Sequence, residues 1–199
     1  MESKVVYFEQ VRPENTEVTF GLVKERLKPL GIRKLVVAST TGATAQKALE
    51  FFKGTDVKLI VMPHQFDFRR DTNPFPPELV STLKASGHEV HFGTMLFHTD
   101  DFYGTNHASV MANLLRCFSQ GTKVCFEMVL MATDAGLLTK GETVIAMAGT
   151  GRGSDTALVM QASSSQNLKK LRVHEILCKP LHPWNIDETR ENLLKKKPG

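Results

Sequence analysis

Short apolar segments alternate with amphipathic segments along most of this chain. Near-continuous apolar strands separated by helices are typical of a mainly parallel sheet covered by helices. The last expected strands follow one another without helices, which predicts antiparallel pairing at one edge of the sheet. We expect an α/β fold with strands at Val5–Phe8, Lys34–Ala38, Lys58–Met62, Glu89–Phe92, Glu142–Ala148, Ala157–Ala162 and Val173–Cys178, and helices at Glu14–Leu30, Ala43–Phe52, Pro77–Ser86, Ala108–Phe118 and Thr122–Leu138.

The loops between these segments differ in length according to their direction. Helix-to-strand loops such as Gly31–Arg33 and Gly54–Asp56 are short, whereas the strand-to-helix loops Ser39–Thr44, Pro63–Pro76 and Gly93–His107 are long and polar. In an open parallel sheet, all strand-to-helix loops leave from the carboxyl ends of the strands, and ligands bind at that edge. The asymmetry therefore predicts a functional site at the carboxyl edge of the sheet.

The first of the long loops suits a phosphate group. It joins an apolar strand to an amphipathic helix, whose first N–H groups lack intrahelical acceptors and whose dipole attracts anions. The alternative is that Thr41 or Thr44 only caps the helix. If the loop binds a ligand, the contacts come from its glycine, its hydroxyls and its backbone: Ser39, Thr40, Thr41, Gly42, Ala43 and Thr44.

A second turn, Ala148–Thr156, follows the strong strand that ends near Met147. Its glycines permit a nest of N–H groups able to hold an anion, and an arginine supplies a planar donor. The aspartate suits a sugar or ribityl hydroxyl. The alternative is a plain glycine-rich hairpin. The turn is neither a Walker A loop nor a dinucleotide fingerprint, and its candidate ligand contacts are Thr150, Gly151, Arg152, Gly153, Ser154, Asp155 and Thr156.

Charge and cysteine content narrow the classes of partner. The formal net charge is +4, but three consecutive lysines begin at Lys195, so about +1 remains on the body of the chain. Without a basic stripe we expect no nucleic-acid partner. Three cysteines without paired spacing suit a reducing cytoplasm, with Cys117 and Cys125 buried in helices. No signal peptide or membrane-spanning segment is expected, which predicts a cytoplasmic protein without a membrane partner.

The two turns, in this order, resemble the C-terminal domain of pyruvate kinase. The matching motifs are Thr40–Ala45, where a loop opens a helix, and Gly153–Thr156, which precedes a closing strand. The whole chain is similar to stand-alone prokaryotic proteins with that fold, which are associated with FMN and have no settled activity. The match covers roughly residues 4 to 185, and Glu14–Thr16 is its early matching segment. One departure is Ala43, where pyruvate kinases often carry arginine.

The resemblance has several implications for this chain. It implies a three-layer α/β/α sandwich of residues 1–185, mostly parallel with an antiparallel edge strand, followed by a basic tail at 186–199. It also implies that residues 41–44 hold a phosphate and that the second turn closes over the ligand. Pyruvate kinase activity is not expected, because the chain carries no barrel and no phosphoenolpyruvate machinery. The fold often self-associates, so a homo-oligomer is an open expectation.

Other loop residues are weaker candidates for chemistry. Phe66, Phe68 or Phe97 could stack on a flat ring, and Arg69 could balance the charge of a reduced flavin. His98 with Asp100 or Asp101 could perform acid–base work. Within the long apolar helix we expect Glu127 and Asp134 to face solvent, with lining of the site as the alternative. No metal site is expected.

Three functions remain open from the sequence. The first is an FMN-binding cytoplasmic protein, with a flavin oxidoreductase as its enzymatic form. The second is a non-catalytic regulatory module that senses a phosphorylated metabolite. The third is an interaction subunit whose loops are only structural. Each makes a different prediction for the carboxyl edge of the sheet.

Overall fold

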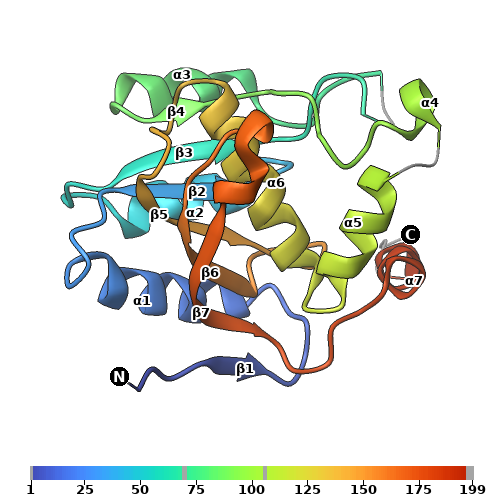
Figure 1. Ribbon diagram of the computed structural model, residues 1–199. Helices are drawn as coiled ribbons and strands as arrows, with labels where there is room; N and C mark the ends of the chain where they lie inside the picture. Colours follow the sequence, from blue (N-terminus) through green and yellow to red (C-terminus); the bar gives the residue numbers. More distant parts are fainter. Residues whose placement is uncertain (1, 69–70, 105–106, 196–199) are drawn as a thin grey trace.

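The computed structural model describes residues 2–68, 71–104 and 107–195 (Figure 1). Within these residues the strands are β1 Val6–Phe8, β2 Lys34–Ala38, β3 Lys58–Met62, β4 Glu89–Val90, β5 Thr143–Ala148, β6 Thr156–Gln161 and β7 Arg172–Pro180. The helices are α1 Asn15–Leu27, α2 Ala43–Phe51, α3 Pro77–Ala85, α4 Asp100–Tyr103, α5 His107–Arg116, α6 Gln120–Asp134 and α7 Ile186–Lys195, with a 3₁₀ helix, η1, at Ser165–Lys170.

The strands form one seven-stranded sheet in the order β1-β7-β6-β5-β2-β3-β4. The pairs β1–β7, β5–β2, β2–β3 and β3–β4 are parallel, whereas β6 runs antiparallel to both β5 and β7. The expected α/β fold, mostly parallel with antiparallel pairing among the last strands, is confirmed. The antiparallel strand β6 pairs with β5 on one side and with β7 on the other, so it lies inside the sheet.

Two apolar cores lie on opposite faces of the sheet, because side chains alternate along each strand. In β2, Leu35 and Val37 pack with α1, α2 and α3 on one face. Val36 packs with α6 on the other. The result is the expected three-layer sandwich, with helices visible on both sides of the sheet in Figure 1.

The chain changes direction across the sheet between β4 and β5. It runs outward from β2 through β3 to β4, and then returns to place β5 on the other side of β2. The helix that follows β2 (α2) covers one face, and the helix that precedes β5 (α6) covers the other. The carboxyl ends of β2 and β5 are neighbours, since Val37 pairs with Met147. Such a switch point is where open α/β sheets bind ligands.

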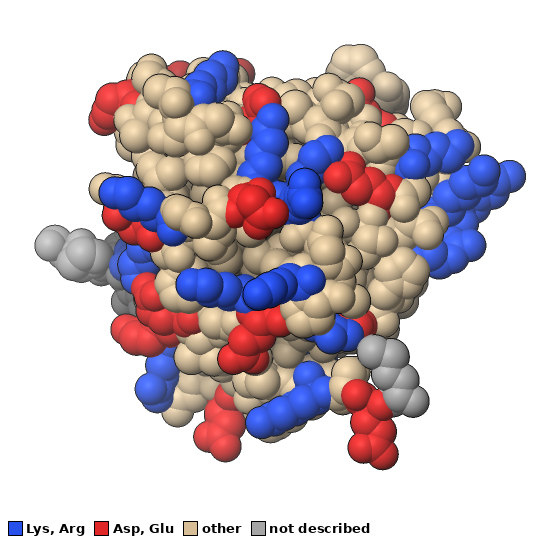
Figure 2. Space-filling model, turned by 90° about the vertical axis from the view of Figure 1, so that its left-hand side faces the viewer, with Lys and Arg blue, Asp and Glu red and all other residues tan. Residues whose placement is uncertain are grey.

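The opposite, amino edge of the sheet is closed by ion pairs. Lys34 Nζ lies 3.0 Å from Glu142 Oε2, and Lys58 Nζ lies 2.8 Å from Glu89 Oε1. All four residues stand at or beside the starts of strands. Acidic and basic side chains are interspersed over most of the face drawn in Figure 2. Charges at this edge are therefore largely matched within the chain.

Three helical segments were not predicted: α4, η1 and α7. Helix α7 occupies most of the expected tail, while Lys196 and Lys197 lie outside the described residues. Its start carries a capping signal, because Asn185 Oδ1 accepts from the N–H of Glu188 and Glu188 Oε2 accepts from the N–H of Asn185, at 2.9 and 2.8 Å. The pattern Asn-x-x-Glu could have revealed the helix.

Cysteine burial was only partly predicted. Cys125 is buried in the α6 core as expected, but the prediction for Cys117 is wrong. Cys117 follows the end of α5 and is exposed, with its Sγ donating to the Asn113 carbonyl at 3.6 Å. No helix in the described part of the chain combines the length and apolarity that a membrane crossing requires.

Two helical glycines provide a matched test of this packing. A Cβ at Gly121 in α6 would lie 2.3 Å from Thr156 Oγ1, whereas a Cβ at Gly21 in α1 would meet nothing within 4 Å. We expect Gly121→Ala to lower the free energy of unfolding by about 1–3 kcal/mol through overpacking. Gly21→Ala should raise it by about 0.5–1 kcal/mol through helix propensity. Urea denaturation checks both; changes of equal sign would contradict the packing of α6 on β6.

Candidate ligand site at the carboxyl edge

The turn between β2 and α2 leaves backbone donors free. Gly42 has a φ of 86°, and a Cβ there would lie 2.7 Å from Leu79 Cδ2, so glycine is required. The capping hydroxyl is that of Ser39, which accepts from the N–H of Ala45 at 3.1 Å, rather than that of Thr41 or Thr44. Among the described residues, no acceptor meets the N–H of Ala43 or Thr44. These two donors point out of the first turn of α2.

The hydroxyls of this turn differ in access. Thr41 is exposed and Thr44 is buried. Thr40 is half-buried, with its Oγ1 3.2 Å from Nε2 of His64, which follows β3. A ligand at the surface would therefore meet the Thr41 hydroxyl and the free N–H groups before it met Thr44.

The second turn is a hairpin, Gly149–Asp155, that joins β5 to β6 through the paired residues Ala148 and Thr156. Asp155 is 2% exposed and accepts from the N–H of Thr150 at 3.0 Å and from Thr156 Oγ1 at 2.8 Å. Burial raises the pKa of Asp155, although these hydrogen bonds oppose the change. The carboxylate holds the hairpin together, and its contact with a ribityl or sugar hydroxyl stays a prediction.

Both helical layers hold the hairpin in place. From α1, Thr16 Oγ1 accepts from the N–H of Ser154 at 2.9 Å, and Thr19 Oγ1 donates to the Ser154 carbonyl at 3.2 Å. From the start of α6, Ser119 Oγ lies 3.0 Å from Thr156 Oγ1. Gly153 has a φ of 74° and fits tightly against α1, since a Cβ there would lie 2.4 Å from Thr16 Oγ1. The hairpin backbone is thus fixed on both sides of the sheet.

The tip of the hairpin keeps unused donors. Gly151 and Arg152 are exposed, and Arg152 makes no ion pair or hydrogen bond with the residues that the structure describes. Thr150 Oγ1 and Ser154 Oγ are buried without a hydrogen-bond partner among these residues. Buried hydroxyls without partners cost stability, so such groups are candidates for contact with water or a ligand.

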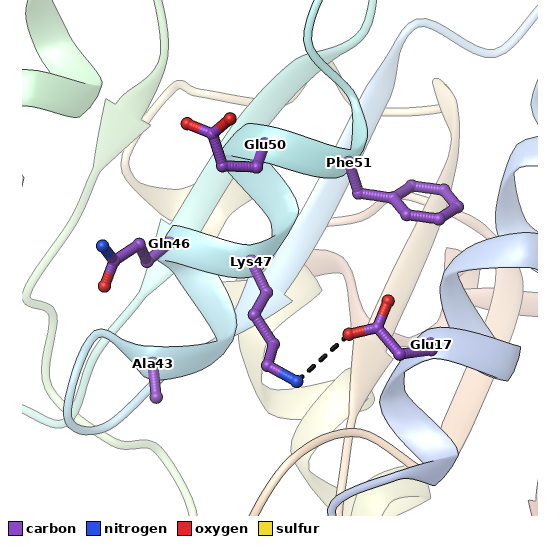
Figure 3. A pocket seen from close by; sticks show the side chains of 6 residues that line it. All are labelled: Glu17, Ala43, Gln46, Lys47, Glu50 and Phe51. Atoms are coloured by element: carbon purple, nitrogen blue, oxygen red, sulfur yellow. Dashed lines mark hydrogen bonds and ion pairs between the residues drawn. The ribbon is translucent and has the colours of Figure 1, made fainter.

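A shallow groove of about 570 Å³ adjoins the first turn on the α1–α2 side. Figure 3 shows Glu17 of α1 and Lys47 of α2 reaching toward each other across it, with Lys47 Nζ 3.1 Å from Glu17 Oε1. Ala43 lies at one end of the groove, and Glu17 is next in sequence to Thr16, which binds the hairpin. The lining residues are Glu17, Ala43, Gln46, Lys47, Glu50 and Phe51.

A buried charged cluster lies on the α6 side of the same edge. Lys123 Nζ lies 2.5 Å from Glu127 Oε2 and 3.2 Å from His98 Nδ1, and the N–H of Phe97 donates to Glu127 Oε1 at 2.7 Å. The expectation that Glu127 faces solvent is wrong, because the loop that carries Phe97 covers this face of α6. Asp134, two turns later, is exposed and accepts from the N–H of Ser165.

The cluster shifts the protonation of its members. Burial alone would raise the pKa of Glu127, but the imidazole of His98 and the ammonium of Lys123 outweigh it and lower the pKa to about 2. Burial is the main reason why the pKa of Lys123 is lowered. Glu127 therefore stays ionised in the folded protein at neutral pH, with Lys123 as its counter-charge.

The aromatic and histidine candidates occupy different positions at this edge. Phe97 is 7% exposed, with its ring 5.4 Å from Lys123 Nζ, and contact with a ligand stays a prediction for it. Phe66 is largely exposed. Phe68 packs its ring against both His64 and His98, with centroids 4.9 and 5.1 Å apart.

The acid–base partners expected for His98 are not those observed. His98 contacts Lys123 and Glu127, whereas Asp100 accepts from Ser109 Oγ. The side chains of Arg69 and Asp101 lie outside what the structure describes. Across the described residues, no group of three or more His, Cys, Asp or Glu side chains could hold a metal ion.

Several residues that shape this edge were not identified as site residues from the sequence. Lys123, Thr16, Thr19 and Ser119 act through partners distant in the sequence. The spacing of Lys123 and Glu127, four apart on one helix face, was the available signal for the ion pair. The hydroxyls of α1 gave no local signal, because their shared partner Ser154 lies 138 residues from Thr16 and 135 from Thr19.

Comparison with known proteins gives a family and two similar structures. The family model for "Pyruvate kinase, alpha/beta domain" matches residues 19–160. A pyruvate kinase from Cryptosporidium parvum in complex with ADP is 15% identical over 78% of this chain and 25% of its own, with a TM-score of 0.42. A second structure of that enzyme is 13% identical over 75% and 22%, with a TM-score of 0.40. The chain spans about a quarter of the length of these pyruvate kinases.

The buried ion pair makes a testable contribution to stability. We expect Glu127→Gln to lower the free energy of unfolding at pH 7 by about 3–5 kcal/mol, because Lys123 is left buried without a counter-charge. The double variant Lys123→Met with Glu127→Gln should be less destabilised than Glu127→Gln. Glu142→Gln, which breaks a half-exposed pair, serves as the control and should cost about 1 kcal/mol or less.

The same pair sets a pH dependence. Because the folded-state pKa of Glu127 is about 2, below its usual value of 4.5, its contribution is present above pH 4.5 and is lost as the pH falls through about 2. The stability advantage of the wild type over Glu127→Gln should therefore shrink across this window in urea titrations. An advantage that stays constant down to pH 2 would contradict the assignment.

Proposed function

The chain belongs to the pyruvate kinase alpha/beta domain family, and we propose that it binds a phosphorylated small molecule, with FMN as the candidate ligand. The phosphate lies at the switch point between the carboxyl ends of β2 and β5. In this proposal the protein binds a flavin, and the activity proposed for it as an enzyme is that of a flavin oxidoreductase.

The observation that carries the proposal is a set of unused donors on two adjacent turns. The N–H groups of Ala43 and Thr44 open α2 without acceptors in the described part of the chain, and the dipole of the helix favours an anion there. Arg152 stands exposed on the neighbouring hairpin, without a partner among the residues that the structure describes, and its planar guanidinium suits a phosphate. A dianion between them would receive hydrogen bonds from both sides.

Two directions lead away from this phosphate. The groove between α1 and α2 carries the carboxylates of Glu17 and Glu50, which disfavour further anionic groups. The other direction crosses the edge from Thr40 to His64 and the ring of Phe68. Aromatic and imidazole rings suit a flat heterocycle, so the body of the ligand takes this second direction.

A second candidate function is non-catalytic sensing of a phosphorylated metabolite. It is favoured by the nature of the free donors, which recognise the phosphate and are indifferent to the group that bears it. The two functions differ in one outcome: a sensor binds several phosphorylated compounds about equally, whereas a flavin-binding protein prefers FMN over simpler phosphates.

A charge placed at the start of α2 tests the phosphate site. Ala43→Glu adds a carboxylate that the helix dipole tolerates but a phosphate does not, so folding should be unaffected while FMN affinity falls about tenfold or more. Ala43→Gln, of matched size without charge, should keep most of the affinity. Isothermal titration with FMN, and with riboflavin as the ligand that lacks phosphate, measures both.

The guanidinium on the hairpin is tested separately. Arg152→Ala should weaken FMN binding about tenfold, the loss of a charge-assisted hydrogen bond. Arg33→Ala, which removes an exposed arginine at the amino edge, is the matched control and should change nothing. Riboflavin that binds as tightly as FMN, or binding indifferent to both Ala43→Glu and Arg152→Ala, would refute the phosphate site.

A further inference from the structure

The buried cluster of Lys123, Glu127 and His98 takes no part in the phosphate contacts proposed above. The side chains of Lys123 and Glu127 are 0% and 3% exposed, whereas that of His98 is 19% exposed. Burying a lysine and a glutamate is costly, and an apolar pair of similar size would often serve packing as well. His98 is thus the only one of these three side chains that solvent or a ligand can reach to a substantial extent.

The position of His98 Nδ1 suggests what the cluster can do. Nδ1 lies 3.2 Å from Lys123 Nζ, a donor, and 3.5 Å from Glu127 Oε1, an acceptor. We assign the closer contact to the resting state, in which the Lys123 ammonium donates to Nδ1 and the ring carries its proton on Nε2. The hydrogen bond from His98 that helps to lower the pKa of Glu127 requires a proton on Nδ1, so it belongs to the state in which Nδ1 is protonated and not to this resting state. The Glu127 oxygen is then available as an acceptor for a proton that arrives on Nδ1.

We propose that these three residues form a proton relay, in which His98 Nε2–H delivers a proton to a carbonyl oxygen or ring nitrogen of a phosphorylated ligand. As the Nε2 proton leaves, Lys123 Nζ transfers one proton to Nδ1, and the new Nδ1–H donates to Glu127 Oε1. Lys123 ends as a neutral amine and the imidazole stays neutral throughout. The reverse sequence takes a proton from the ligand and restores the ammonium, so no oxidant or reductant is required.

Burial favours the loss of a proton from the Lys123 ammonium, which is the step that the relay requires of this residue. Desolvation lowers the pKa of this ammonium, which makes loss of its proton easier than for a solvated lysine. Glu127 remains ionised in both states and accepts a hydrogen bond from the group that carries the transferred proton, which is Lys123 Nζ before the transfer and His98 Nδ1 after it. In this arrangement His98 is the group that meets the ligand, and Lys123 and Glu127 are positioning residues that act through it.

The relay adjoins the proposed phosphate site, and its ligand half rests on the proposed function. Thr40 of the first turn contacts His64, and the ring of Phe68 packs against both His64 and His98. A molecule anchored by its phosphate at α2 and extended across Phe68 would bring its far end toward His98. The ligand class is therefore a phosphorylated compound with a proton acceptor at the end opposite the phosphate.

The tautomer of His98 tests the relay without any ligand. Long-range ¹H–¹⁵N NMR of the full chain at pH 7 should show the proton on Nε2, with Nδ1 as an acceptor. In Lys123→Met the donor is lost, and the proton should move to Nδ1, where Glu127 accepts it. The double variant Lys123→Met with Glu127→Leu provides a second reading if the single variant folds poorly, because neither replacement offers Nδ1 a donor or an acceptor, so the fixed Nε2–H tautomer should be lost. A wild-type ring protonated on Nδ1, or one unchanged in both variants, would overturn the relay.

Binding tests the ligand half. His98→Gln should weaken FMN about tenfold, the loss of one good hydrogen bond, and leave glycerol 3-phosphate, which has no such acceptor, unchanged. His174→Gln, an exposed histidine near the start of β7, is the matched control. The His98 Nε2 signal should shift with FMN and not with inorganic phosphate.

The outcomes separate this inference from the proposed function. FMN affinity that depends on Arg152 but not on His98, with an unmoved Nε2 signal, overturns the ligand half of the relay and leaves the phosphate site intact. If none of the phosphorylated probes binds the wild type, the proposed function and the ligand half fail together. The tautomer measurement decides the internal relay in either case.

Discussion

The structure depends on one buried carboxylate that closes the hairpin between β5 and β6. Asp155 accepts from the N–H of Thr150 and from Thr156, and so fixes the turn at the middle of the sheet. Helix α1 and the start of α6 then bind the same hairpin from opposite faces through Thr16 and Ser119. The closed hairpin is therefore a point at which both helical layers are held at the carboxyl edge.

The amino and carboxyl edges of the sheet differ in how their charged and polar groups are paired. At the amino edge, lysines at the strand starts are matched by glutamates within the chain, as for Lys34 with Glu142. At the carboxyl edge, within the described residues, the first N–H groups of α2 and the Arg152 guanidinium have no partner, and a buried charged cluster lies behind His98. Unmatched donors beside a switch point are the physical basis for placing a ligand there.

Much of the fold follows from local pattern. The strands β2 and β3 were predicted with the bounds that the structure has, because their near-continuous apolar runs end in polar turns on both sides. That the two candidate turns lie at one edge was also predictable, since both follow parallel strands; the register of Val37 with Met147 makes them neighbours.

What the sequence could not supply is which polar side chains are buried. Glu127 was expected in solvent because a helix pattern shows its own face and not the loop that covers it; Phe97 seals it from 30 residues away. For Asp155, local pattern gave no sign that its oxygens accept hydrogen bonds from its own hairpin. Such assignments depend on tertiary contacts and need coordinates.

The proposed function depends on a phosphate that binds between the two turns at the carboxyl edge. The most direct measurement is a backbone amide NMR titration of the ¹⁵N-labelled protein with FMN. We expect the largest shifts on the amides of Ala43, Thr44 and residues 150–153, with smaller changes toward His64 and His98. Shifts concentrated elsewhere, or a spectrum unchanged at saturating FMN, would contradict it.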